Sequence, residues 1–107
     1  MTQFSGVWRI IETDVWDVDA LEMVGPALLS FGADGLGDLT MIAIEADVDY
    51  RVDDRSAGLC EFSFAGADDG SPVSGRGWAG IDGDRLRGKL LFHRGDETTF
   101  VAVRRTD

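Results

Sequence analysis

The stretch FSGVWRIIETDVWD, residues 4–17, decides how the chain begins to fold. Between Gly6 and Thr13 apolar side chains recur at every second position, a pattern typical of a β-strand with one buried face. Trp8 is the largest of these side chains, and we expect it to face the interior of the domain. The sequence therefore predicts that the chain starts as a strand of a sheet.

Glu12 admits two interpretations. If strict alternation continues along the strand, Glu12 faces the interior and needs a cation such as Arg76 or Arg104, because a desolvated carboxylate is costly. Alternatively, a bulge between Ile10 and Ile11 changes the face, or the strand has already reached the rim of the sheet.

Residues 17–24 predict one short helix of about two turns. Asp17 or Asp19 can cap its first turn, and Gly25 followed by Pro26 ends it.

The rest of the chain consists of short alternating runs separated by Gly and Asp turn signals, as in an all-β sandwich or barrel. The strands expected after the helix are 27–31, 37–46, 48–52, 59–65, 75–81, 86–93 and 98–104. Their connections are short enough for hairpins, so the chain reads as a meander. We expect an all-β fold in a single domain, residues 1–107: an antiparallel up-and-down barrel of about eight strands with one short helix between strands 1 and 2.

The interior of such a barrel holds its own side chains or one small ligand. Alternation directs seven rings inward: Trp8, Phe31, Tyr50, Phe62, Phe64, Phe92 and Phe100. Rings of this size should fill most of the space. We therefore expect no large lipid cavity, and any ligand is small or held at the barrel mouth.

Residues 39–44 are apolar on both faces, which predicts a cover on each side of that strand. The cover is either the short helix, through Leu21 and Val24, or a second copy of the protein.

Gly6, Val7 and Trp8 on the first strand, with Arg104 or Arg105 closing the last, form a pattern that resembles the calycin superfamily of lipocalins and their relatives. In that superfamily the tryptophan plugs one end of the barrel, and an arginine from the final strand packs across the indole. The resemblance implies that Trp8 and Arg104 form such a plug here.

Over nearly its whole length the chain is also similar to a family of short bacterial proteins of unassigned activity. The residues that carry this likeness are Trp8-Arg-Ile, Trp16-Asp17, Gly25-Pro26-Ala27, Ser74-Gly-Arg-Gly-Trp78-Ala and Phe92-His-Arg-Gly-Asp96. The likeness implies one compact domain and assigns no catalytic residue.

Composition narrows the choice of partner and compartment. Twenty acidic and ten basic residues give a formal net charge of -10, which repels phosphate backbones and anionic lipid headgroups. We expect neither nucleic acid nor membrane as a partner, although an acidic surface can attract a basic protein. The lack of a long apolar run or signal peptide, together with the single Cys60, favours the cytoplasm.

No constellation of residues predicts catalysis, a metal site or a cofactor. Asp47 with Asp49, and Asp82 with Asp84, lack the remainder of a calcium loop. His93 is the only histidine and is expected on the surface, while Cys60 is expected in the core.

The best functional hypothesis is a non-enzymatic cytoplasmic module that binds a small ligand at the barrel mouth, near Glu12, Trp16, Tyr50 and Arg104. The alternative is a protein-interaction module, in which the acidic surface or residues 39–44 meet a basic partner or form a homodimer. A hydrolase-type enzyme, with Glu12 and Asp14 as acid and base, is the third candidate.

Overall fold

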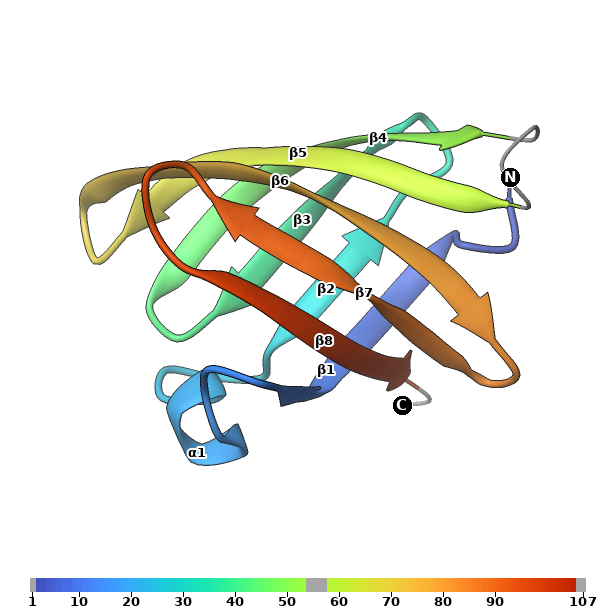
Figure 1. The fold of residues 1–107 in the computed structure, drawn as a ribbon. Helices are drawn as coiled ribbons and strands as arrows, with labels where there is room; N and C mark the ends of the chain where they lie inside the picture. The colour runs from blue at the N-terminus through green and yellow to red at the C-terminus, as the bar shows by residue number, and fades with distance from the viewer. Residues whose placement is uncertain (1, 54–57, 106–107) are drawn as a thin grey trace.

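The computed structural model describes residues 2–53 and 58–105, whose strands close into a barrel in which each strand pairs with the next along the chain (Figure 1). The expected antiparallel meander with a helix between strands 1 and 2 is therefore confirmed. The elements are β1 Gly6–Thr13, α1 Val18–Leu21, β2 Leu28–Phe31, β3 Leu36–Met41, β4 Ile44–Asp53, β5 Leu59–Asp68, β6 Ser71–Asp82, β7 Arg85–Phe92 and β8 Glu97–Arg104.

The first and last strands close the barrel, and their register contains a bulge. Trp8 pairs with Arg104 and Ile10 with Ala102, but the next partner of β8 is Glu12. Ile11 is thus an extra residue in β1, and an extra residue changes the face of everything that follows it. Glu12 is exposed as a result, so the bulge interpretation of this strand is confirmed.

The expected strand 37–46 is wrong, because the chain turns at Ile42 and Ala43 and residues 44–46 begin β4. Ile42 adopts a φ of +58°, a conformation that β-branched residues rarely take. Its amide donates to the carbonyl of Leu21 over 2.7 Å, so the turn packs against the end of α1. Contact with α1, rather than a cover on both sides of one strand, accounts for the apolar residues here.

The helix is shorter than expected and lies at one end of the barrel, next to the β3–β4 turn (Figure 1). Asp17 caps it as predicted, with a carboxylate oxygen that accepts from the amide of Ala20 over 2.8 Å. Leu21 is fully buried, but Val24 is 75% exposed, so the prediction that Val24 packs on the barrel is wrong. The helix ends before Val24, which leaves that residue in the connection to β2.

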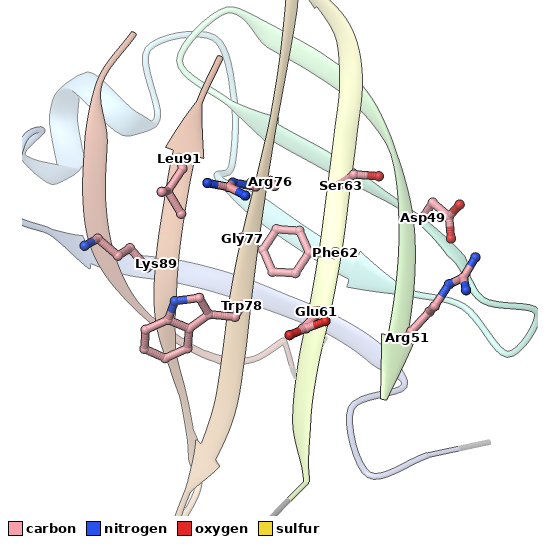
Figure 2. A pocket seen from close by; sticks show the side chains of 10 residues that line it. All are labelled: Asp49, Arg51, Glu61, Phe62, Ser63, Arg76, Gly77, Trp78, Lys89 and Leu91. Atoms are coloured by element: carbon pink, nitrogen blue, oxygen red, sulfur yellow. The ribbon is translucent and has the colours of Figure 1, made fainter. Parts of the chain in front are cut away.

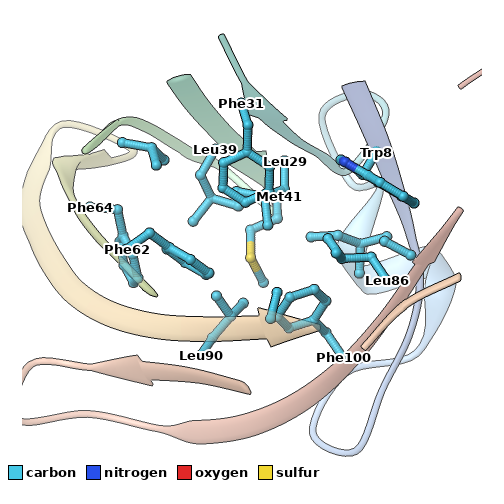
Figure 3. Close-up of a cluster of buried hydrophobic side chains, with 14 of the residues drawn as sticks. Trp8, Leu29, Phe31, Leu39, Met41, Phe62, Phe64, Leu86, Leu90 and Phe100 are labelled. Atoms are coloured by element: carbon cyan, nitrogen blue, oxygen red, sulfur yellow. The ribbon is translucent and has the colours of Figure 1, made fainter. Parts of the chain in front are cut away.

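Side chains fill the barrel interior, as Figure 3 shows. Of the seven rings expected inside, six are buried and Phe92 is half-buried. Phe31 is central, with its ring centroid 4.9 Å from that of Tyr50 and 5.9 Å from that of Phe62. Phe4, which precedes β1, is also fully buried and packs on Phe31 at 6.4 Å.

Two glycines of β6 make room for two of these rings. A Cβ at Gly77 would come within 2.6 Å of the Phe62 ring, and one at Gly75 within 2.5 Å of the Phe64 ring. Glycine is required because both rings approach the β6 backbone closely. Trp78, which follows Gly77, points outward instead.

Candidate functional site

Trp8 and Arg104 are in contact at the end of the barrel where β8 ends. Trp8 is buried, and the guanidinium carbon of Arg104 lies 4.3 Å from the centroid of its ring. The indole NH donates to the carbonyl of Phe4 over 2.9 Å, and Nη1 of Arg104 donates to the carbonyl of Ser5 over 2.8 Å. These bonds tie the segment before β1 to the last strand and cover the indole.

Tyr50 belongs to this same end. Its hydroxyl donates to the carbonyl of Gly32 in the β2–β3 turn, and its ring is buried against Phe31. The structure thus gives Tyr50 a packing and hydrogen-bonding role in the interior.

Glu12 is near the end of β1 and Trp16 lies between β1 and α1, so both belong to the opposite end of the barrel, where Figure 1 shows α1. The ring of Trp16 is half-buried and packs edge-on against Phe92, with centroids 5.8 Å apart. The structure therefore does not bring Glu12, Trp16, Tyr50 and Arg104 into one site. Ligand binding by any of the four remains a prediction.

Asp14 is fixed by the start of β8. Its carboxylate accepts from the buried hydroxyl of Thr98 and from the amide of Thr99, the latter over 3.1 Å. The hydrogen bond from Thr98 holds the pKa of Asp14 below its ordinary value, against a smaller opposing effect of desolvation. A carboxylate held in its ionised form is a good acceptor and a poor general acid.

A groove of about 600 Å³ lies on the outer surface of the barrel over β4–β7 (Figure 2). Its lining residues are Asp49, Arg51, Glu61, Phe62, Ser63, Arg76, Gly77, Trp78, Lys89 and Leu91. Most of these are the outward members of two neighbouring rows of cross-strand pairs. One row runs through Arg51, Glu61, Trp78 and Lys89, and the other through Asp49, Ser63, Arg76 and Leu91.

Trp78 is the prominent side chain of this groove. It is 44% exposed, whereas Trp8 is 1% exposed. Large rings that remain exposed on a folded surface are often binding residues, because a partner that covers them buries their apolar surface. The sequence signal was available: in β6 the small residues Gly77 and Ala79 face inward, which places Trp78 on the outer face.

Most of the charged side chains around Trp78 form no ion pair among the described residues. Across the described parts of the chain, residues 2–53 and 58–105, no ion pair involves Arg51, Arg76, Asp49 or Glu61. Lys89 differs, because its ammonium pairs with the carboxylate of Glu97. Two guanidiniums and two carboxylates thus remain available as donors and acceptors in the groove.

A second groove, of about 850 Å³, continues the first toward the β7–β8 turn. The two share Asp49, Ser63, Arg76 and Leu91, so they adjoin along this row of side chains, and we call the two grooves together the trough. The second groove ends at Phe92, His93 and Arg94.

The remaining candidates for chemistry lie apart from the trough or show no reactive feature. Cys60 is buried, and desolvation, followed by the charge of Glu61, raises the pKa of its thiol to about 12. His93 is exposed at the end of the second groove. In the part of the chain that the structure describes, no cluster of three or more His, Cys, Asp or Glu residues could hold a metal ion. The same part of the chain contains no helix with the length and hydropathy of a membrane span.

Comparison of the chain with protein-family models, with curated proteins and with solved structures gave no match. The candidate site therefore stands on its geometry alone.

Proposed function

We propose that this protein is a non-enzymatic binding module that holds a small, ring-bearing polar ligand in the outer groove beside Trp78. The observation that carries the proposal is an exposed indole among donors and acceptors that make no ion pairs with one another. A flat apolar surface supplies contact area, and a few polar groups around it fix orientation, which is the usual composition of small-molecule sites.

This proposal moves the ligand from the barrel mouth to the outer wall. The interior is filled by side chains, and Trp8 and Arg104 cover one end of the barrel. At the other end, Trp16 is engaged with Phe92. The outer trough offers open volume next to an exposed ring, and this favours it over the mouth.

A calycin relationship and a cytoplasmic location form part of the proposal. The stacking of Arg104 on Trp8 supports the first, because the superfamily pattern requires that contact. The single, buried cysteine supports the second.

Ligand-observed NMR tests the binding proposal. The wild-type protein is mixed with a pool of neutral sugars, nucleosides and aromatic amino acids, and saturation transfer identifies the class that binds. We expect Trp78→Ala to weaken binding of that class at least about tenfold, because it removes the stacking surface. Trp78→Tyr should retain most of the affinity.

Glu12→Gln is the matched control, since Glu12 is exposed and lies outside the trough. Unchanged binding in this variant supports the outer site. If Glu12→Gln loses binding and Trp78→Ala does not, the ligand binds at the barrel mouth and the outer site is wrong. A dimer that forms with rising concentration, with no binder in the pool, would favour the interaction module.

A further inference from the structure

We propose that the ligand is an uncharged linear oligosaccharide, with one sugar ring on Trp78 and its chain running along β6 into the second groove. This inference rests on the proposed function, because it needs a ligand in the groove beside Trp78. It adds the chemical class of that ligand and the path that the ligand takes.

The first argument is the charge balance of the trough. Among the residues that the structure describes, the trough carboxylates without an ion pair are those of Asp47, Asp49 and Glu61, and the guanidiniums without one are those of Arg51, Arg76 and Arg94. Lys89 is neutralised by Glu97. An acidic chain of formal charge -10 thus carries a strip with equal numbers of opposite charges, which favours neither an anion nor a cation.

The second argument is the match between these groups and hydroxyls. A sugar hydroxyl both donates and accepts, so carboxylates and guanidiniums can each bond a pair of neighbouring hydroxyls. Ser63, at the centre of the trough, adds a further group that both donates and accepts. The indole of Trp78 can pack against the apolar C–H face of a sugar ring and bury it without requiring charge.

The third argument is length. Trp78 lines the first groove and Ser74 the second, and residues four apart on an extended strand are separated by about 13 Å. One sugar ring cannot span that distance, whereas a short chain can. The two grooves adjoin along the row that they share, so a chain that crosses this row reaches both of them.

The substitution Ala65→Phe tests the contribution of the second groove to binding independently of the first. Ala65 is exposed on β5 and, of these two grooves, lines the second and not the first, opposite Asp47 and Ser74. A phenyl ring at this position should obstruct the second groove and leave the surroundings of Trp78 intact. Circular dichroism and amide NMR spectra establish that each variant keeps the fold.

The probes are an array of neutral linear glycans that differ in linkage, followed by a series of the best binder from one to six units. Calorimetry measures affinity, and amide NMR maps the contacts. For the wild type we expect affinity to rise with chain length and then level off, with shifts over both grooves. Trp78→Ala should weaken every member at least tenfold, whereas Ala65→Phe should bind the shortest member normally and lose the gain from length.

Each contrary result has a definite meaning. If nucleosides or aromatic amino acids bind beside Trp78 and no neutral glycan does, the oligosaccharide assignment is overturned while the binding module stands. If glycans bind with equal affinity at all lengths, the path along β6 is wrong. If nothing in the array or the pool binds at the trough, or if a protein partner covers it, both proposals fall.

Discussion

The contact between Arg104 and Trp8 shows which residues the sequence could place in advance. A tryptophan after Gly6-Val7 and an arginine at the far end of the chain predicted this contact, and the guanidinium stacks 4.3 Å from the indole centroid. The direction of Glu12 could not be decided, because a bulge at Ile11 has no residue signature of its own. The exposure of Trp78 agrees with alternation along β6 but was not predicted, and its neighbours in the groove depend on the register of four strands.

Gly77→Ala should destabilise the fold by about 2 kcal/mol or more, since overpacking of this kind costs about 1–3 kcal/mol. The added Cβ would lie 2.4 Å from the carbonyl oxygen of Lys89 and 2.6 Å from the Phe62 ring. Urea unfolding measures the change. Gly25→Ala is the control, because nothing lies within 4 Å of its Cβ, and it should alter stability by less than about 0.5 kcal/mol. Equal effects in both variants would contradict this reading of the core.

Elements were easier to predict than their boundaries. Alternation identified all eight strands, but it could not place the turn at Ile42 and Ala43. A turn is predicted from Gly, Asn or Asp in the sequence, because these residues adopt a positive φ most readily. Here the residue with a positive φ is the β-branched Ile42. The amide of Ile42 donates a hydrogen bond to the carbonyl of Leu21 in α1. Because this partner is distant in the sequence, no local pattern predicted the turn.

The segment between β1 and α1 is tied to β8 through Asp14, which makes that link sensitive to pH. The hydrogen bond from Thr98 lowers the pKa of Asp14 from its ordinary value of 3.8, so the ionised carboxylate stabilises the fold. This contribution is complete above the unfolded value and is lost as pH falls through the lower, folded pKa.

Asp14→Asn should therefore unfold at lower urea concentration than the wild type near neutral pH, and the gap should narrow as the pH falls below the ordinary value of 3.8. Asp84→Asn, at the exposed β6–β7 turn, controls for the removal of one negative charge from an acidic chain. A gap that persists unchanged in acid would show that the charge of Asp14 is not what stabilises the link.

At the scale of the whole molecule, closure was predictable from the number of strands and their short connections, and the filled interior from the count of inward rings. The outer trough was not predictable, because it arises from the twist and register of β4–β7 together. Closure depends on the pairing of β1 with β8, which joins the two ends of the sequence.

Amide hydrogen exchange tests that pairing. Amides in the middle of β8, at Val101 and Ala102, should exchange as slowly as those of β5, because both strands have a partner on each side. In a sheet that remained open between β1 and β8, the amides facing the gap would exchange much faster. NMR after transfer into deuterated water resolves the two outcomes.

The continuous ladder has a consequence for recognition. Many proteins capture a peptide by letting it join a sheet as one more strand, and unprotected strand edges also seed domain exchange and fibril growth. In the described parts of the chain each of the eight strands has a hydrogen-bonded neighbour on both sides, so none is an edge strand that is open along its whole length. We therefore expect side chains on the barrel wall, rather than strand addition, to make the contacts with any binding partner.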